Sequence, residues 1–548
     1  MTSIDRLAGW IRSRAGWHAA LLASVTGAAS VLAMAPFHVW PVLCLTLAAL
    51  VWQMDGAIAR AAAASAGTWR ARAWLGAAVT GWWFAFGYFF AGLFWIGEAF
   101  FVDGGRLLLL VPFAVTLMPA GLALFWAAAT AAASCVWRPG LSRVLALTLA
   151  LGAAEWLRGH ILTGFPWNVL GYALTYPLSL MQSASVFGIY GLTLIAVFVL
   201  AAPLVTWADG GATRARGGIA LIATILAMMA YGHWQLAQPT AAPSADAPRI
   251  RLVQPSIPQH EKWRPEHQRR IFDHHIALTT KNAAGVDDGA ASVDMIIWPE
   301  AAMPFLPLDT PEAIEVIGKV LPAGTQLVSG ALRTHVDDAE KPLSDRRLYN
   351  SLIAFSAGAE VAAIYDKIHL VPFGEYLPLQ ALFESIGLRP LTRKRGDGFT
   401  AGVAPRPQIS VLPGRPFVPL ICYEAIFPSA AVQGQRPTFL VNLTNDGWFG
   451  NTTGPRQHLH QARVRAVEEG LPLLRVANNG ISAVIDAQGR ILHRLDLDVV
   501  GTIDARLPSP MPATAYSRYG DLPFALMLAS GLAVLLWGAM RRGRTAGI

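Results

Sequence analysis

Long apolar segments alternate with short polar ones through the first 237 residues and again near the end of the chain. A helix needs about 20 apolar residues to cross a bilayer core. Residues 15–54 contain no charged side chain, and Pro36 and Pro41 divide them into two helices. Further spans are expected at residues 76–97, 107–134, 144–156, 186–207, 218–234 and 522–540. The pattern therefore predicts a multi-pass α-helical membrane domain with about eight spans.

Between residues 247 and 508 the pattern changes to short apolar runs separated by polar loops. The strand candidates are IRLVQPSI (250–257), DMIIWPE (294–300), TQLVSGAL (325–332), NSLIAFSA (350–357), VPLICYE (418–424) and TFLVNLTND (438–446). Two amphipathic helices are expected at residues 266–281 and 455–470. Strands that alternate with helices predict an α/β layered domain. We expect seven helices in residues 1–237, the α/β domain in residues 247–508, and the eighth span with a basic tail in residues 519–548.

Composition supports an integral membrane protein, because 54% of residues are hydrophobic and only 14% are charged. The net charge of +8 does not indicate a nucleic-acid partner, since the arginines lie in short clusters between apolar runs. With eight spans, all of these clusters fall on one side of the membrane: Arg6, Arg12, Arg14, Arg60, Arg70, Arg72, Arg138, Arg143, Arg214, Arg216, Arg541, Arg542 and Arg544. The positive-inside rule then places both termini in the cytoplasm and residues 247–508 outside it.

The first apolar run ends in AMA (33–35), which resembles a signal-peptide cleavage site. Pro36 follows at once and is unfavourable after a cleavage point, so we expect a retained first helix. The chain has three cysteines, and an odd count leaves at least one thiol free within a single chain. Cys44 and Cys135 lie in apolar runs, whereas Cys422 lies at the end of a predicted strand, in PLICYEAIFP (419–428).

Three predicted strands end in residues that can do chemistry together. Glu300 follows IIWP, Lys367 follows a short strand with Glu375 eight residues later, and Cys422 ends PLIC. A thiolate is a nucleophile, a carboxylate can take its proton, and an ammonium can stabilise an oxyanion. Singly, each has an ordinary interpretation, as a buried thiol or a solvated loop charge. Together they predict acyl-enzyme chemistry on sulfur, if the strand ends meet.

The surrounding motifs carry a resemblance that covers essentially the whole chain. In order they are EWLRGHILTGFPWNVLGY (155–172), LVQPSIPQHEKW (252–263), WPEAAMPF (298–305), YDKIHLVPFGEYLP (365–378), CYEAIFP (422–428), NLTNDGWFG (442–450) and QHLHQARVRAVEEGLPLLRVANNGISAVID (457–486). The sequence resembles the carbon–nitrogen hydrolase (nitrilase) superfamily and, more closely, its bacterial apolipoprotein N-acyltransferase family. The resemblance implies an αββα sandwich for the α/β domain.

The resemblance also implies roles for seven residues. Cys422 would be the nucleophile of a Glu-Lys-Cys triad, Glu300 its general base, and Lys367 the stabiliser of the tetrahedral intermediate. Supporting or substrate-binding roles would fall to Glu375, Tyr423, Glu424 and Trp263.

The reaction implied by the resemblance is ping-pong acyl transfer without a cofactor or metal. A phospholipid, typically phosphatidylethanolamine, would give its sn-1 acyl chain to Cys422. The α-amino group of the N-terminal diacylglyceryl-cysteine of an apolipoprotein would then take the chain from the thioester, which completes lipoprotein maturation. Both substrates carry lipid tails, so membrane lipid is an expected partner. The implied location is the bacterial inner membrane, with a periplasmic catalytic domain.

Several features keep more than one interpretation. The apolar stretch at residues 378–388 fits either core or a mobile lid, and NDGWFG (445–450) would shape the wall of the site. His458 and His460 lack a third ligand at metal-site spacing, so no metal is expected. Glu98, Glu155 and Arg158 lie at predicted membrane ends, where headgroup contact and snorkelling explain them equally well.

Two other functions remain open from the residues alone. A membrane-tethered amidase would use the same triad with water as the acyl acceptor. A transporter or scaffold would carry an inert α/β domain, although the predicted spans contain few of the ionisable residues that mark an ion pathway.

Overall fold

The structure is a computed structural model. It describes residues 2–64, 69–102, 108–239, 246–291, 293–338, 340–342, 345–358, 360–378, 398–429 and 431–545. The chain forms two compact units: a membrane unit (Met1–Phe101, Gly105–Gln238 and Thr514–Ile548) and an α/β unit (Val102–Gly104 and Pro239–Ala513).

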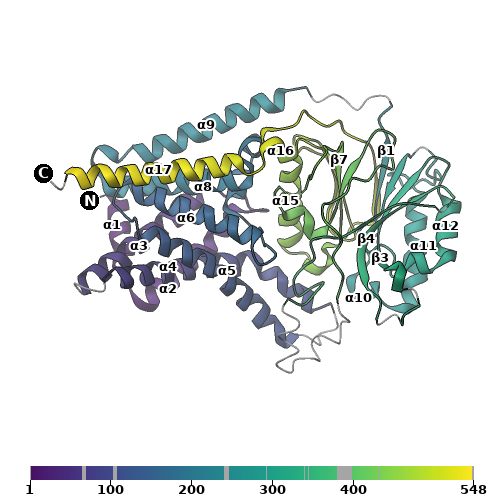
Figure 1. Ribbon diagram of the computed structural model, residues 1–548, viewed down its shortest axis with the longest axis horizontal. Helices are drawn as coiled ribbons and strands as arrows, with labels where there is room; N and C mark the ends of the chain where they lie inside the picture. Colours follow the sequence, from purple (N-terminus) through teal and green to yellow (C-terminus); the bar gives the residue numbers. More distant parts are fainter. Residues whose placement is uncertain are drawn as a thin grey trace. The chain divides into compact units, whose positions relative to one another are not determined.

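Helices make up nearly all of the membrane unit (Figure 1). Its longer helices are α1 (Ser3–Ser13), α2 (Gly16–Ser30), α3 (Val42–Ala64), α4 (Trp69–Leu93), α5 (Val111–Ser134), α6 (Leu141–His160), α8 (Ala184–Asp209), α9 (Arg216–Ala237) and α17 (Leu522–Thr545). Within the described residues, six helices are long and apolar enough to cross a membrane: α2, α3, α4, α5, α8 and α9. The apolar part of α17, Leu522–Gly538, is shorter, and α6 is not among the six. The chain is therefore a multi-pass membrane protein, and eight spans stays a prediction.

Glu155 and Arg158 do not snorkel, contrary to one of the two interpretations above. Both side chains are fully buried on α6, and Arg158 Nη2 lies 2.6 Å from Glu155 Oε2. Trp126 Nε1 donates to Glu155 Oε1 at 2.6 Å, and Arg158 Nη1 donates to the carbonyl of Trp167 at 3.1 Å. Charges that are expensive in a membrane interior are tolerated when they pair with each other and with backbone groups. The pair thus ties α6 to α5 and to the loop that follows α6.

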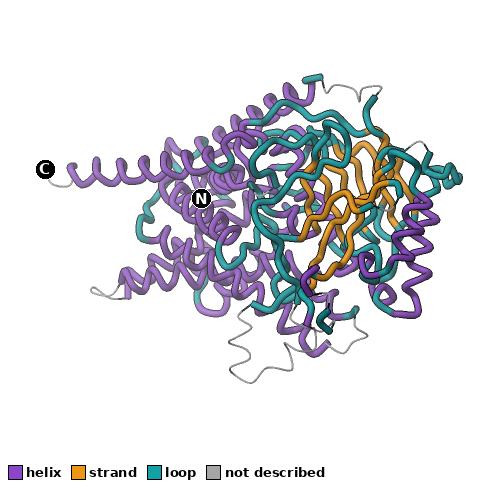
Figure 2. The backbone as a smooth tube through the Cα atoms, turned by 45° about the vertical axis from the view of Figure 1, so that its right-hand side comes forward, coloured by secondary structure: helices purple, strands orange, loops and turns teal. Residues whose placement is uncertain are grey.

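Two β-sheets face each other in the α/β unit, and Figure 2 shows their strands gathered in one block. One sheet has six strands in the order β11-β1-β2-β3-β4-β5, and the other has five in the order β10-β9-β8-β7-β6. The strands of the two sheets are β1 (Arg249–Gln254), β2 (Met295–Ile297), β3 (Gln326–Thr334), β4 (Leu348–Ser356), β5 (Val361–Asp366), β6 (Phe417–Ile421), β7 (Phe439–Thr444), β8 (Leu473–Ala477), β9 (Ser482–Ile485), β10 (Ile491–Leu495) and β11 (Gly501–Arg506). All six strand candidates of the sequence are present.

Apolar side chains on both faces of these strands create the layers. Ile250, Ile297 and Leu352 on the six-stranded sheet form one core with Phe417 and Val441 on the other. The opposite face of the six-stranded sheet packs on α11 (Gln268–Thr279) and α12 (Pro311–Val320). The opposite face of the five-stranded sheet packs on α15 (Gly454–Glu469), as Figure 1 shows. Helices thus cover both outer faces, and the predicted αββα sandwich is confirmed.

Candidate active site

Strand register brings Glu300, Asn350 and Lys367 to one edge of the six-stranded sheet. The strands β2 and β3 are parallel, so Glu300 follows β2 at the edge where β3 also ends. The next strand runs antiparallel and begins at that edge, with Asn350 opposite Leu332. Ser351 in turn pairs with Asp366, the last residue of β5, so Lys367 follows at the same edge. Residues far apart in sequence therefore meet because Glu300 follows β2 beside Gly330 of β3, and Asn350 and Lys367 lie on the next two strands of the sheet in register.

The turn that carries Glu300 lies directly against β3. Ala302 N donates to the carbonyl of Gly330 at 2.9 Å, and Gly330 N donates to the carbonyl of Pro299 at 3.2 Å. A Cβ atom at Gly330 would stand only 2.5 Å from Glu300 Cα, so any larger residue there would displace the turn. Glycine at this position lets the backbone of Glu300 approach the strand closely.

The side chains at this edge form one hydrogen-bonded cluster. Lys367 Nζ donates to Glu375 Oε1 at 2.9 Å and lies 3.7 Å from Glu300 Oε1. Asn350 Nδ2 lies 2.8 Å from Glu300 Oε1 and 2.9 Å from Glu375 Oε1 and donates to both. Glu375 also accepts a 2.8 Å bond from Val371 N through Oε2. One ammonium and one amide thus hold two carboxylates side by side.

Cys422 occupies a turn in which ordinary residues are uncommon. It directly follows β6 as the first residue of the 3₁₀ helix η10 (Cys422–Ile426), and its φ of 49° is in the left-handed region. This conformation costs a non-glycine residue roughly 1–2 kcal/mol. Backbone strain of this kind clusters at functional sites because it aims a side chain in a direction that relaxed backbone does not allow.

Burial and two neighbouring charges act on the pKa of the Cys422 thiol. Burial raises its pKa, the charge of Glu300 raises it further, and the charge of Lys367 opposes both. The resting side chain is accordingly a neutral thiol that needs a base before it can attack. Two of the three charged members of the cluster at the sheet edge, Glu300 and Lys367, therefore act on the pKa of Cys422.

The pKa values of two buried lysines at the site are shifted in opposite directions. Burial favours neutral Lys367, but the charges of Glu375 and Glu300 outweigh it and raise its pKa, so this side chain is a stable cation. Burial lowers the pKa of Lys262 to about 8, and Glu300 only partly opposes this. Lys262 Nζ donates to the backbone carbonyl of Glu300 at 3.1 Å, which fixes the turn of Glu300 from a second side.

Glu424 holds the loop after Lys367 rather than lining the cluster itself. Its Oε1 accepts hydrogen bonds from the backbone N–H groups of Ile368 and His369 at 3.0 and 3.1 Å. Arg406 Nη2 lies 3.0 Å from the same oxygen. Burial alone would raise the pKa of Glu424, but the charge of Arg406 and the hydrogen bonds from the Ile421 backbone and the Tyr365 hydroxyl outweigh it and keep the pKa below its ordinary value. Glu424 is thus a buried carboxylate anchor between η10 and the Lys367 loop.

The remaining predicted residues lie around the cluster. Tyr423 packs edge-on against His369 and Phe427. Trp263 follows Lys262 directly, at the end of the short helix α10 (Gln259–Lys262), and is 42% exposed. Of the apolar stretch at residues 378–388, only Pro378 falls within the described residues. Among the described residues no group of three or more His, Cys, Asp or Glu side chains could hold a metal ion.

Asn350 and Lys262 are the residues that the sequence analysis missed. Asn350 opens a predicted strand, and nothing in that pattern indicates that its amide joins two carboxylates. Lys262 adjoins Trp263 in the motif HEKW, and its near-complete burial is unusual for a lysine. The only feature of the sequence that points to a role for Lys262 in the site is its position in the motif HEKW.

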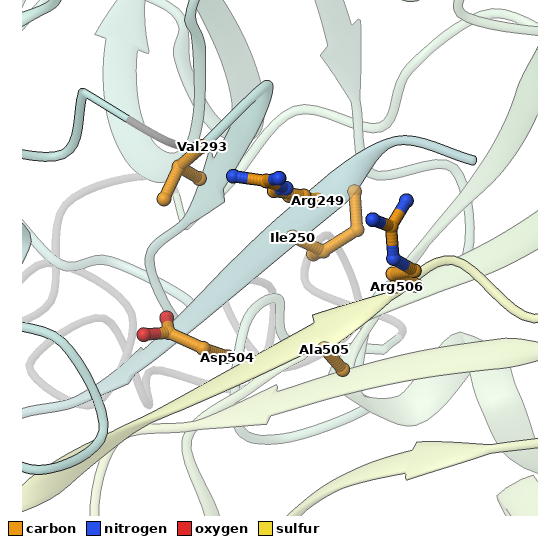
Figure 3. Close-up of a pocket in the computed structure, with 6 residues that line it drawn as sticks. All are labelled: Arg249, Ile250, Val293, Asp504, Ala505 and Arg506. Atoms are coloured by element: carbon orange, nitrogen blue, oxygen red, sulfur yellow. The ribbon is translucent and has the colours of Figure 1, made fainter. Parts of the chain in front are cut away.

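A cavity of about 240 Å³ lies elsewhere in the α/β unit (Figure 3). Its lining residues are Arg249, Ile250, Val293, Asp504, Ala505 and Arg506. Arg249 begins β1, whereas Glu300 follows the carboxyl end of the parallel strand β2. The cavity therefore opens at the opposite end of these strands from the cluster and is not part of the candidate active site.

Comparison with known proteins identifies the family of this chain. Residues 249–515 match the carbon-nitrogen hydrolase family, and residues 26–202 match the apolipoprotein N-acyltransferase N-terminal domain. The chain is 44% identical to an apolipoprotein N-acyltransferase of Rhodopseudomonas palustris over 97% of both chains. It is 45% identical to that of Bradyrhizobium diazoefficiens, over 96% of this chain and 95% of the relative. It is 44% identical to the apolipoprotein N-acyltransferase of Brucella suis, over 92% of this chain and 93% of the relative. The chain belongs to the apolipoprotein N-acyltransferase family of carbon–nitrogen hydrolases.

Proposed function

We propose that the chain is a phospholipid-dependent apolipoprotein N-acyltransferase that works through a thioester on Cys422. The observation that carries the proposal is the cluster of Glu300, Lys367 and Glu375, in which the charges of Glu300 and Lys367 act on a thiol in a left-handed turn. The apolipoprotein acceptor is taken from the names of the relatives, of which this chain covers 97% and 95%. Phosphatidylethanolamine is the proposed acyl donor.

In the first half-reaction Glu300 takes the proton of the Cys422 thiol. The resulting thiolate attacks the sn-1 ester carbonyl carbon, and Lys367 stabilises the oxyanion that forms. The carbon–oxygen bond then breaks, and the leaving alkoxide takes the proton from Glu300. A lysophospholipid departs, and the acyl chain stays on sulfur.

In the second half-reaction the lipoprotein amine attacks the thioester carbonyl. Glu300 takes a proton from the amine nitrogen, and Lys367 again stabilises the oxyanion. The carbon–sulfur bond breaks, the amide forms, and the Cys422 thiolate recovers its proton from Glu300. The same three side chains thus serve both steps, and the acyl-enzyme that links the steps makes the transfer ping-pong.

The two carboxylates are suited to different tasks in this scheme. Among bonds between described residues, Glu375 accepts three hydrogen bonds, whereas Glu300 accepts one. Hydrogen bonds to the charged form of a carboxylate stabilise it as an ion. Glu300 is accordingly the base, and Glu375 holds Lys367 in place as a cation.

We also propose the orientation that the arginine clusters predict. Residues 1–237 and 519–548 would form the membrane domain, with both termini in the cytoplasm, and residues 247–508 would lie in the periplasm. Enzyme fusions that are active only in one compartment test this orientation. A periplasmic reporter fused after residue 508 should be active, and the same reporter fused after residue 548 should be inactive.

The reaction is tested with phosphatidylethanolamine labelled in its sn-1 chain and a synthetic diacylated lipopeptide. The proposal expects label on the peptide amine, in equal amount to lysophospholipid released. Label that appears only as free fatty acid would instead favour an amidase-like hydrolase with water as acceptor. An acetylated peptide N-terminus is the matched control and should receive no label.

A further inference from the structure

His458 lies directly behind the nucleophile, although nothing in the proposed mechanism uses it. It belongs to α15, the helix that covers the five-stranded sheet, and its side chain is fully buried. Its Nε2 is 3.1 Å from the backbone carbonyl oxygen of Cys422, and its Nδ1 is 2.9 Å from Asp446 Oδ1. The imidazole therefore bridges the turn of Cys422 and a buried carboxylate.

The chemistry of these partners fixes the position of one proton. A backbone carbonyl oxygen only accepts hydrogen bonds, so Nε2 must carry hydrogen for the contact with Cys422 to be a bond. The other nitrogen has two compatible states. A neutral ring accepts at Nδ1 from Arg475 Nη2, 3.2 Å away, and a protonated ring donates from Nδ1 to Asp446. Both states keep the hydrogen on Nε2 and the donation to Cys422.

Two more buried residues hold the ring in place. Arg475 Nη2 lies 2.7 Å from Asp446 Oδ2, and the hydroxyl of Thr444 donates to Asp446 Oδ1 at 2.9 Å. Arg475 belongs to β8 and also donates to the side-chain oxygen of Asn442 on the neighbouring strand β7. The side chains of Asp446, His458 and Arg475 are all fully buried. Such a buried and mutually satisfied network is rigid, because each lost partner would leave a polar group without a hydrogen bond.

We propose that His458 is a positioning residue that holds the carbonyl of Cys422 and thereby maintains the left-handed turn that aims its sulfur. This inference rests on the proposed role of Cys422 as the nucleophile. A residue at a φ of 49° tends to relax unless its surroundings prevent it. The carbonyl is one end of the Cys422 backbone, and a donor that is itself held by Asp446 restrains it without contacting the sulfur.

Two amide substitutions separate the two contacts of the ring. The amide nitrogen of glutamine reaches about the position of Nε2, whereas that of asparagine reaches only the position of Nδ1. His458→Gln therefore keeps a donor for the Cys422 carbonyl, and His458→Asn keeps only the contact with Asp446. His460→Asn is the matched control, because it changes another buried histidine of the same helix that makes no bond to Cys422.

The measurement is the rate at which iodoacetamide alkylates Cys422 in the full-length protein, followed by peptide mass spectrometry. Thermal unfolding of each variant is recorded in parallel. We expect His458→Asn to slow alkylation about 10- to 100-fold, the size of effect that follows a misplaced reacting group. His458→Gln and His460→Asn should stay near the wild-type rate. Acyl-enzyme formation from phosphatidylethanolamine should show the same order of variants.

Equal rates for the Gln and Asn variants, whether both fast or both slow, would overturn the proposal, because the donor to Cys422 would then not matter. A slow Gln variant with a fast Asn variant would overturn it in favour of the Asp446 contact. Alkylation requires neither acyl donor nor acceptor. If the alkylation rates of His458→Gln and His458→Asn differ but the wild-type protein transfers no acyl chain, only the proposed function is rejected. If the wild type transfers the acyl chain but the two alkylation rates are equal, only this inference is rejected.

Discussion

Lys367 lies closer to Glu375 than to Glu300, with Nζ–Oε1 distances of 2.9 and 3.7 Å. The shorter pair holds the ammonium in position, and the longer one leaves the Glu300 carboxylate less engaged. The proposed roles of Glu300 as the base and Glu375 as the residue that holds Lys367 depend on this difference. Mutating the two glutamates should therefore lower the acylation rate by unequal amounts.

Glu300→Gln should remove the base and little else. The glutamine oxygen can still accept the hydrogen bond from Asn350, so the fold should be preserved. Loss of a general base costs about 10²- to 10⁴-fold in rate. We expect a decrease of that size in acylation of Cys422, measured by single-turnover mass spectrometry. An unchanged acylation rate would remove Glu300 from the chemistry.

Glu375→Gln should have a smaller effect on the same rate. Lys367 would lose its closest charge partner and become less fixed, which we expect to slow acylation about 10- to 100-fold. The comparison with Glu300→Gln is the informative one, in the same single-turnover assay. A larger loss in Glu375→Gln would reverse the two roles.

Asn350→Leu should lower stability as well as rate. The amide nitrogen donates to both Glu300 and Glu375, and leucine would leave two buried carboxylates side by side without it. We expect the free energy of unfolding to fall by about 1–3 kcal/mol. The change is measured by denaturant unfolding of the purified protein. Asn350→Asp, of the same shape, should be worse because it adds a third carboxylate; equal stability of Asn350→Leu and wild type would contradict this account.

The pKa of Lys262 predicts a pH dependence of stability. Folding lowers this pKa from 10.5 to about 8, so between these values the unfolded chain binds more protons than the folded one. Stability should therefore rise as pH increases from about 8 towards 10.5. Below pH 8 Lys262 is charged in both states, so its destabilising contribution has its full size there. Melting temperatures of wild type and Lys262→Met across this range test the prediction. Lys262→Met should lack this rise, and parallel curves would argue against a buried, proton-releasing Lys262.

The Glu155–Arg158 pair predicts non-additive mutations in the membrane unit. Removing one partner leaves an uncompensated buried charge and should cost about 3–5 kcal/mol. Glu155→Leu and Arg158→Leu should each destabilise the protein more than the double variant does, in thermal unfolding in detergent. A double variant with the sum of the two single losses would show that the charges do not compensate each other.

Much of the α/β unit could be predicted from its hydrophobic pattern. Runs such as IIWPE and PLICYE are apolar enough to be buried on both faces, and their last residues mark where Glu300 and Cys422 leave the sheet. Period and composition do not determine register, however. Asn350 joins Glu300 and Glu375 because β4 is paired so that its first residues lie beside the end of β3. A one-residue shift would turn its side chain to the other face of the sheet.

Burial could not be predicted for charged groups. Glu155 and Arg158 lie near the end of a short apolar run, where sequence alone allows exposure at the interface. Their burial depends on Trp126 from α5 and on the loop after α6, which become neighbours only in the folded bundle. The contact of His458 with the Cys422 carbonyl likewise joins residues that are 36 positions apart.

The central claim is that Cys422 carries the acyl chain between two substrates. It is tested most directly by the intact mass of the purified protein after incubation with phosphatidylethanolamine and no acceptor. We expect the wild-type protein to gain the mass of one acyl chain. Hydroxylamine should remove this chain, a diacylated lipopeptide should discharge it, and Cys422→Ala should not acquire it. Wild-type protein that gains no mass and releases no lysophospholipid would contradict this claim.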